Sequence, residues 1–252
     1  MKILLSPAKS LNFKSSLPTE NYSEPCFLKE ANFLNSILKS KNPAQISELM
    51  HISSSLGELN YERFQEWSSK PNKVNARQAI YAFSGDVYKG IDSYTIKNDK
   101  IDFLQNNVRI LSGHYGLLKP LDLIQPHRLE MGTKMSFKCY KNLYDYWKKQ
   151  VSLELNEQLS EDEPVLNLAS NEYFKVIDSK VIDSPIYSAN FKQYRDGDFK
   201  TIAIYSKKAR GLMTRFIVDN QIDTIEEIKL FDYDGYVFHQ KLSNDKNFVF
   251  TR

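Results

Sequence analysis

A lysine and a glutamate, each placed just after a predicted strand, are the residues of this chain best suited to acid–base chemistry. Lys9 follows a short apolar run at Ile3–Leu5, and Glu172 follows a strand predicted at Pro164–Ala169. Open sheets build their sites at strand ends, and a lysine beside a carboxylate can move a proton or clamp a substrate. A salt bridge that only ties two loops together is the structural alternative. Four polar neighbours are candidates for the same pocket: Ser6, Asn167, Ser170 and Tyr173.

A second pattern with chemical potential is a run of basic residues on a helix predicted from Ser206 to Asn220. Its four cations have no acid between them, and they are Lys207, Lys208, Arg210 and Arg215. A cationic helix start is unfavourable for the helix dipole unless an anion binds there. We therefore interpret the run as an anion-binding surface, with a solvated basic face as the alternative.

A glycine-containing turn after the strand predicted at Val108–Leu111 could bind phosphate. The turn consists of Gly113, His114, Tyr115 and Gly116. Glycines let successive backbone N–H groups point at one phosphate, as in a helix-hairpin-helix element, which would here lie around residues 98–125. Lys119 and Arg128 would add positive charge. An ordinary strand-to-loop turn that needs two glycines is the alternative.

The usual signatures of cofactor, metal and nucleophile chemistry are missing from the sequence. It contains no GxGxxG, Walker A, HExxH or GxSxG pattern. The four histidines are scattered, without the paired spacing of metal ligands, at His51, His114, His127 and His239. We therefore predict no cofactor and no metal site, and these motifs leave the function open.

Composition predicts a soluble, cytoplasmic protein. The 252 residues are 41% hydrophobic and 26% charged, which is ordinary for a globular protein and excludes disorder of the bulk of the chain. The net charge of +3 is far below that of a histone-like protein, so a nucleic-acid site requires local clustering. Two cysteines without CxxC spacing favour a reducing compartment, and no stretch is apolar enough for a signal peptide or a membrane span.

Strands and helices alternate along the chain, and no Ser-, Pro- or Gly-rich linker divides it. The pattern predicts a single α/β or α+β domain over residues 1–252, with a mixed sheet and surrounding helices. Further strands are expected at Ala79–Phe83, at Ile182–Tyr194 and Phe199–Tyr205 around a turn, and, as short edge strands, at Tyr236–Phe238 and Phe248–Phe250. Helices are expected at 25–40, from Pro43, at 56–67, at 98–107 and at 138–159.

Five sequence motifs occur in order along the chain: SPAKSLNF from Ser6, NARQAIYAFSGDVYKG from Asn75, LSGHYGLLKPLDLIQPHRLEMG from Leu111, NLASNEYF from Asn167 and KKARGLM from Lys207. Together they resemble the YaaA family of bacterial peroxide-stress-response proteins over essentially the whole chain. Two positions depart from the family pattern. Ser10 stands where the family usually has Thr and keeps the hydroxyl, and His127 stands where it usually has Tyr.

The resemblance implies a cytosolic protein with a mixed α/β fold peculiar to the family. It also implies survival of hydrogen peroxide, a limit on reactive intracellular iron, and DNA binding through a positively charged cleft and a helix-hairpin-helix-like element. We therefore expect a DNA-binding stress protein that depends on DNA shape more than on sequence, contacting DNA through the glycine turn, Lys119, Arg128 and the basic helix. No membrane or protein partner is expected.

An enzyme is the alternative. It would act on a nucleobase, a nucleoside or another small anionic substrate, in a pocket formed by the SPAKS, LSGHYG, NLASNEY and KKARGLM segments. The enzyme alternative would account for the many polar residues near strand ends, which DNA binding alone leaves without a role.

Overall fold

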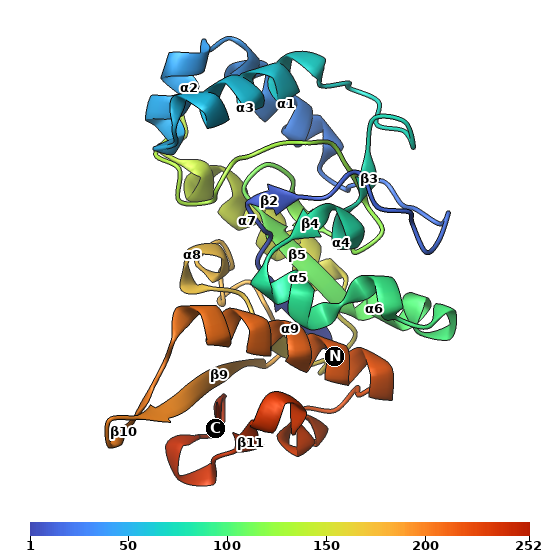
Figure 1. The fold of residues 1–252 in the computed structure, drawn as a ribbon, viewed down its shortest axis with the longest axis vertical. Coiled ribbons are helices and arrows are strands. Elements are labelled where there is room, and N and C mark those ends of the chain that lie inside the picture. The colour runs from blue at the N-terminus through green and yellow to red at the C-terminus, as the bar shows by residue number, and fades with distance from the viewer.

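A twisted sheet of eight strands runs through the computed structural model, which describes all residues from 1 to 252 (Figure 1). The strand order is β11-β12-β9-β8-β1-β5-β6, and β10 pairs with the far end of β9. The five strands from β12 to β5 are parallel, whereas β11, β6 and β10 are antiparallel to their neighbours. The strands are β1 (Lys2–Leu5), β5 (Val108–Ser112), β6 (Gly116–Leu118), β8 (Val165–Asn167), β9 (Ile186–Arg195), β10 (Asp198–Lys200), β11 (Val237–Phe238) and β12 (Asn247–Thr251).

Helices cover both faces of this mixed sheet, which makes the fold α/β, as the sequence predicts. The helices α1, α2 and α3 gather at one end of the molecule, and α9 lies beside α5 (Figure 1). The α-helices are α1 (Leu28–Lys39), α2 (Pro43–Met50), α3 (Ser54–Glu66), α4 (Ala79–Ala82), α5 (Asp86–Ile91), α6 (Ile101–Asn107), α7 (Leu143–Glu157), α8 (Asn171–Phe174) and α9 (Ala203–Asn220).

Short elements complete the chain. Two small antiparallel ribbons pair β2 (Ser10–Leu11) with β4 (Phe83–Ser84) and β3 (Arg77–Gln78) with β7 (Leu123–Ile124). Single 3-10 turns occupy Ser93–Thr95, Asn98–Lys100, Glu227–Leu230, Tyr233–Gly235 and Gln240–Leu242.

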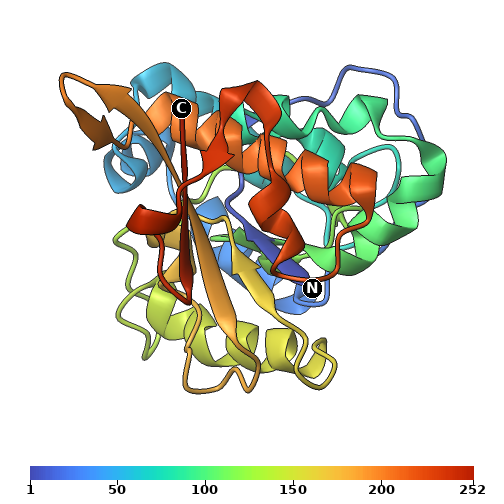
Figure 2. The same ribbon diagram turned by 90° about the horizontal axis from the view of Figure 1, so that it is seen from below.

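Two apolar cores lie on opposite faces of the sheet because alternate residues of a strand point opposite ways. Ile3 and Leu5 belong to a core of 36 buried residues that also contains residues of α5 and α9. Leu4 belongs to a second core of 22 buried residues around Trp147 of α7. A strand that is covered on both faces must be apolar throughout, which explains the unbroken apolar run of β1. Figure 2 shows the sheet between these helical layers.

Helices α5 and α9 touch backbone to backbone over the larger core. A Cβ atom on Gly90 would lie 2.3 Å from the Lys208 carbonyl oxygen, and one on Gly211 would lie 1.9 Å from the Val87 carbonyl oxygen. Real side chains do not approach this closely, so both positions require glycine. The contact fixes α9 against α5 and the sheet.

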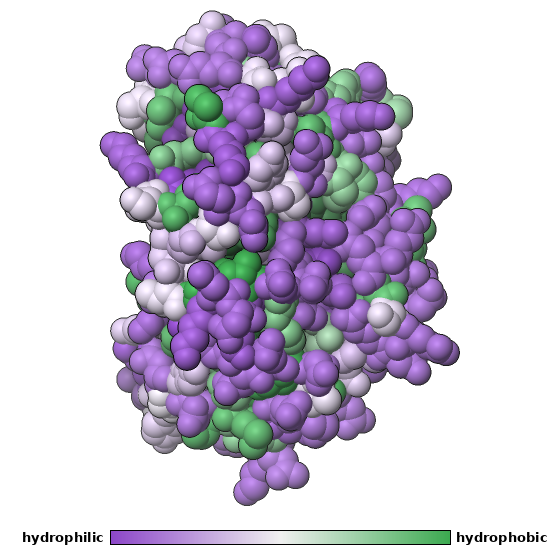
Figure 3. Space-filling model, turned by 90° about the vertical axis from the view of Figure 1, so that its right-hand side faces the viewer, coloured by the Kyte–Doolittle hydropathy of each residue, from purple (hydrophilic) through white to green (hydrophobic).

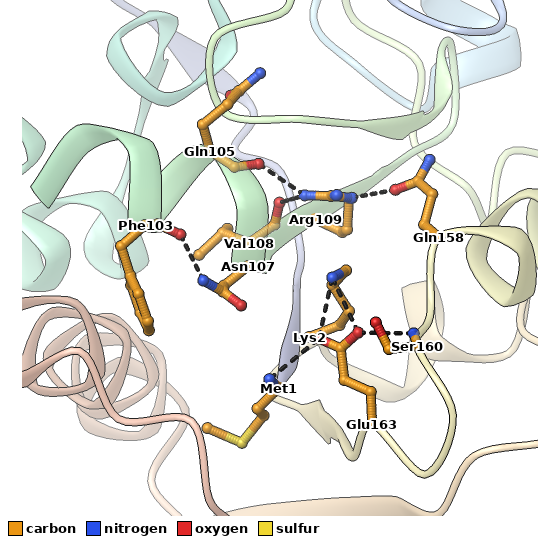
Figure 4. A network of polar contacts seen from close by, with 10 residues as sticks. All are labelled: Met1, Lys2, Phe103, Gln105, Asn107, Val108, Arg109, Gln158, Ser160 and Glu163. Atoms are coloured by element: carbon orange, nitrogen blue, oxygen red, sulfur yellow. Dashed lines mark hydrogen bonds and ion pairs between the residues drawn. The ribbon is translucent and has the colours of Figure 1, made fainter.

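One carboxylate, that of Glu163, holds Met1 and Lys2 at the amino ends of the parallel strands (Figure 4). Glu163 accepts hydrogen bonds from the Met1 ammonium at 3.1 Å, from Lys2 Nζ at 3.0 Å and from the backbone N of Ser160 at 3.1 Å. Its side chain is 12% exposed. Burial alone would raise the pKa of Glu163, but these hydrogen bonds outweigh it and lower the pKa.

Three elements differ from the sequence predictions. Ala79–Phe83 forms the short helix α4 and the start of β4, because residues buried on every side give no periodic pattern to read. The basic helix begins at Ala203, three residues before the predicted cap at Ser206, so Ala203–Tyr205, predicted as the end of a strand, is helical. Phe248 to Phe250 lies in β12, inside the sheet, and β11 forms the edge.

The surface is mostly hydrophilic on the face drawn in Figure 3, where apolar residues form small separate patches. None of the helices combines the length and the apolar character needed to cross a membrane.

We predict that Glu163→Gln lowers the free energy of unfolding by about 1–3 kcal/mol at pH 7, since it removes charged hydrogen bonds. A carboxyl whose pKa is lowered by folding stabilises the protein above its usual pKa and loses that contribution as the pH falls through the lowered value. The gap between the wild type and the variant, measured by urea unfolding, should therefore close between about pH 5 and pH 2. A gap that stays constant over this range would contradict the assignment.

Candidate functional site

The central parallel strands end at one edge of the sheet, and polar residues follow them. Leu4 of β1 is in register with Asn167 of β8, and β5 runs parallel to β1 on its other side. Ser6 comes directly after β1, and Ser112 is the last residue of β5. Carboxyl edges of parallel strands are where α/β sheets bind ligands, so this edge is the first place to look for a site.

Hydrogen bonds join the segments that leave β1 and β8. The backbone N of Ser170 donates to Ser6 Oγ at 2.9 Å, and the two hydroxyl oxygens lie 3.3 Å apart. The Tyr88 hydroxyl donates to the Ser6 carbonyl oxygen at 3.0 Å. The predicted pocket residues Ser6, Ser170 and Asn167 are thus brought to one edge of the sheet.

A narrow pocket with a volume of about 20 Å³, room for about one water molecule, opens at this edge. An ion-pair network crosses it: Lys9 Nζ lies 2.6 Å from Glu130 Oε2, and Arg128 Nη2 donates to Glu130 Oε1 at 2.8 Å. The Lys9 side chain is 62% exposed, whereas that of Arg128 is 15% exposed and its Nε has no hydrogen-bond partner. The polar lining consists of Lys9, Ser112, His127, Arg128, Glu130 and Tyr173.

His127 and Tyr173 are both uncharged in this pocket at neutral pH. Burial lowers the pKa of His127 to about 4. Its Nδ1 lies 2.8 Å from the Gln125 carbonyl oxygen, which can only accept, so Nδ1 carries the proton and Nε2 keeps a lone pair. Burial, helped by the carboxylates of Glu172 and Glu130, raises the pKa of Tyr173 far above its usual value. The pocket therefore combines a base, a neutral phenol and two cations.

Lys9 and Glu172 do not form the direct pair that the sequence suggests, but they contact the same loop. Lys9 binds Glu130, whereas Glu172 Oε1 accepts a hydrogen bond from the backbone N of Gly132 at 3.0 Å. The Tyr144 hydroxyl in turn donates to the Glu172 carbonyl oxygen at 2.8 Å. Glu172 thus supports the loop that carries Glu130.

The predicted phosphate-binding turn is buried between two strands. Its residues are Gly113, His114, Tyr115 and Gly116, none of which is exposed. The Gly113 carbonyl accepts a hydrogen bond from Trp147 Nε1 at 2.9 Å, and Gly116 has a φ of +68° against the same ring. Residues 98–125 contain helix α6 followed by the β5–β6 hairpin, where a helix-hairpin-helix needs a second helix. The prediction of that element is wrong, because the glycines serve a tight turn and ring packing.

The lysines of α9 remain on the surface. Lys207 is exposed and makes no ion pair, and Lys208 Nζ lies 3.4 Å from Asp234 Oδ2 with its side chain 48% exposed. Since α9 begins at Ala203, both lysines lie in its second turn, and the helix-dipole argument for them does not hold. Arg210 is half-buried.

Arg215 and Lys119, two further predicted DNA contacts, make local contacts. Arg215 Nε donates to Asp219 Oδ2 at 2.7 Å, and Nη1 donates to the Thr95 hydroxyl at 2.7 Å. Lys119 is half-buried, and its backbone N donates to Asp122 Oδ2 at 2.7 Å. In this structure Arg215 connects α9 to the turn after α5.

Comparison with known proteins places the chain in a family. The family model described as peroxide stress protein YaaA matches residues 1–242. The chain belongs to the YaaA family. A UPF0246 protein of Flavobacterium johnsoniae is 52% identical over 252 residues, and one of Flavobacterium psychrophilum is 50% identical, each match covering 100% of both chains. A UPF0246 protein of Saccharophagus degradans is 45% identical over 254 residues, covering 100% of this chain and 99% of its own. The predicted resemblance is confirmed, and it supports a role in the peroxide stress response.

Sequence reasoning missed Glu130, Ser112 and the state of His127 among the residues that line the pocket of this YaaA-family chain. A signal for Glu130 was present, because residues two apart in extended backbone point the same way and Glu130 is two residues from Arg128. No sequence signal could have shown that His127 is buried and neutral, because its environment comes from tertiary packing.

We predict that Glu130→Gln lowers the free energy of unfolding by about 1–2 kcal/mol, because Lys9 and the mostly buried Arg128 lose their shared carboxylate. Urea unfolding measures the change. The matched control is Glu20→Gln, which breaks the surface pair with Lys73 and should cost less than about 1 kcal/mol. Equal losses of unfolding free energy in the two variants would show that the ion-pair network in the pocket stabilises the protein no more than a surface ion pair does.

Proposed function

We propose that the protein acts in the peroxide stress response by binding DNA through the lysines of α9. The supporting observation is that Lys207 and Lys208 are adjacent and exposed, on a helix with no acid in its first turn. Lysines that neutralise phosphates release condensed counterions, which gives affinity without sequence preference. The proposed binding therefore depends on DNA charge and shape more than on base sequence.

We also propose that the limit on reactive iron follows indirectly from this binding. Ferrous ions are attracted to DNA phosphates by charge, and a protein that neutralises the same phosphates competes with them. No group of three or more His, Cys, Asp and Glu side chains is placed to hold a metal ion. The lysine variants described next test both parts if iron bound to DNA is measured beside DNA affinity, because competition for phosphates lowers the DNA-bound iron and leaves the free iron no lower.

Reversing both lysines to glutamate, as Lys207→Glu with Lys208→Glu, should weaken DNA binding equally across unrelated sequences. Affinity measured by fluorescence anisotropy at several salt concentrations should fall less steeply with salt, by up to about 1.8 log units per log unit for two lost phosphate contacts. The control is Lys29→Glu with Lys39→Glu on α1, whose lysines are also exposed. The proposal fails if the two double variants bind alike, or if wild-type binding is insensitive to salt.

A second candidate function, catalysis on a small anionic substrate, is favoured by the pocket at the carboxyl edge. His127 Nε2 can accept a hydrogen bond, the Tyr173 hydroxyl can donate one, and Lys9 and Arg128 supply positive charge for a substrate anion. Nucleobases, nucleosides and small anions remain the substrate classes that we propose, and their entry requires the exposed Lys9 side chain to move away from Glu130, because the pocket has room for about one water molecule. The two lysines of α9 that we propose to bind DNA are not among these pocket residues, so the two functions can be tested separately.

Lys9→Ala tests the second candidate in cells. In a strain without the endogenous gene, the variant should fail to restore survival under peroxide, although the exposed ion pair contributes less than about 1 kcal/mol to stability. The control is Lys73→Ala, since Lys73 is 50% exposed and also pairs with one glutamate. Full survival with Lys9→Ala, at equal protein levels, would leave the pocket without a functional role.

A further inference from the structure

Arg210 of α9 is a half-buried cation without a counter-charge. Its Nε is buried and has no hydrogen-bond partner. Burial lowers the pKa of its guanidinium, and Arg210 forms no ion pair with a carboxylate. The other arginine of α9, Arg215, is paired with an aspartate. Since a desolvated charge costs free energy unless an opposite charge or hydrogen-bond acceptors compensate it, Arg210 lacks the partner that its position requires.

Arg210 lies where the buried face of α9 meets its exposed face. Residues three and four apart lie on one face of a helix, and the neighbours of Arg210 at these spacings are Ser206, Lys207, Met213 and Thr214. Lys207 is exposed, whereas the other three are buried, and Met213 belongs to the larger core, which also contains residues of β9. The Arg210 side chain is therefore partly covered by the protein and partly open to solvent.

Strand lengths place Arg210 near the carboxyl edge of the sheet. Asn167, the last residue of β8, is in register with Ser188 of β9. Beyond Ser188, β9 continues for about 16 Å to the level of Lys200, where β10 ends. The chain then turns back, and α9 runs against the direction of β9 (Figure 1). The eight residues from Ile202 to Arg210 recover about 12 Å of this distance. These lengths predict that Arg210 lies close to the level at which β8 ends, beside the pocket and outside the set of residues that line it.

We propose that Arg210 binds one oxyanion of the ligand, a carboxylate or a phosphate, with the Ser206 hydroxyl one turn before it on the same face. This inference rests on the second candidate function, since it gives the pocket at the carboxyl edge the anchor for its anionic substrate. A guanidinium suits this task because its planar N–H groups bind two oxygens of a carboxylate or phosphate at once. The oxyanion of the ligand thus supplies the negative charge that the protein does not place beside Arg210.

Thermal unfolding of the full-length chain with simple anions tests the proposal. Potassium phosphate and potassium acetate are compared with potassium chloride at equal ionic strength, for the wild type and for Arg210→Met. Phosphate or acetate should raise the wild-type Tm by about 2–4 °C more than that of the variant, at about five times its Kd. A general salt effect acts on both proteins alike, so the difference between them is the measurement. A rise in Tm with acetate indicates a site that accepts carboxylates, whereas a rise with phosphate alone indicates a phosphate site.

Two further variants keep the test interpretable. Without any anion, Arg210→Met should unfold at the wild-type temperature or above it, because it removes a desolvated charge and keeps the apolar stem. Arg210→Lys should keep part of the anion effect, since it keeps the charge but not the planar fork. Arg195→Met, which removes an exposed arginine from β9, should behave like the wild type. Equal anion responses in the wild type and Arg210→Met, or no response in the wild type, would overturn the proposal.

Peroxide survival separates failure of this inference from failure of the pocket function. If Lys9→Ala abolishes survival and Arg210→Met does not, the pocket works without Arg210 as its anchor. If Arg210 shows the anion effect while both variants survive normally, Arg210 binds an oxyanion that has no part in the stress response. Loss of survival in both variants, with the anion effect at Arg210, is the expected result.

Discussion

The parallel pairing of β1 between β5 and β8 is the constraint on which the rest of the structure depends. It places three strand ends side by side, so segments far apart in the sequence reach one edge of the sheet. It also exposes β1 to an apolar core on each face, which fixes its register, since a shift by one residue would exchange the residues of the two cores. Every polar residue assigned to the pocket is positioned by this pairing or by loops anchored on it.

The lining of the pocket carries two cations, Lys9 and Arg128, and one carboxylate, Glu130. Glu130 serves both Lys9 and Arg128, and Arg210 forms no ion pair with an acid. Lys9 is 62% exposed, whereas Arg128 and Arg210 are partly or largely buried. Buried cations in excess of acids cost stability, and proteins tolerate that cost where a ligand compensates it. The framework around the site is by contrast tightly determined, by the glycine contact of α5 with α9 and by the carboxylate of Glu163 at the far edge.

The sequence predicted the parts of the fold that depend on local pattern. Val108–Leu111, the alternating strands and helices and the mixed sheet were all readable, because apolar runs and turn residues carry them. Ala79–Phe83 was not, since helix and strand look alike in a short run that is buried on every side. The glycine turn was misread because two glycines fit a buried hairpin as well as a phosphate loop. Glu172 is predicted to follow a strand, and it lies in α8, five residues after β8 ends; its contact with Gly132 depends on tertiary packing that no spacing reveals.

The position of β1 in the middle of the sheet also constrains how the chain can be made. Ile3 leaves the ribosome well before its register partners Val108 and Leu166, because both lie more than 100 residues further along the chain. Until they emerge, the apolar residues Ile3–Leu5 of β1 have no strand to pair with, and loop closure over such distances makes folding slow. A chain that stops before β8 leaves β1 open on one side, as a template for pairing with other chains. Aggregation of truncated products is therefore built into the topology that creates the site.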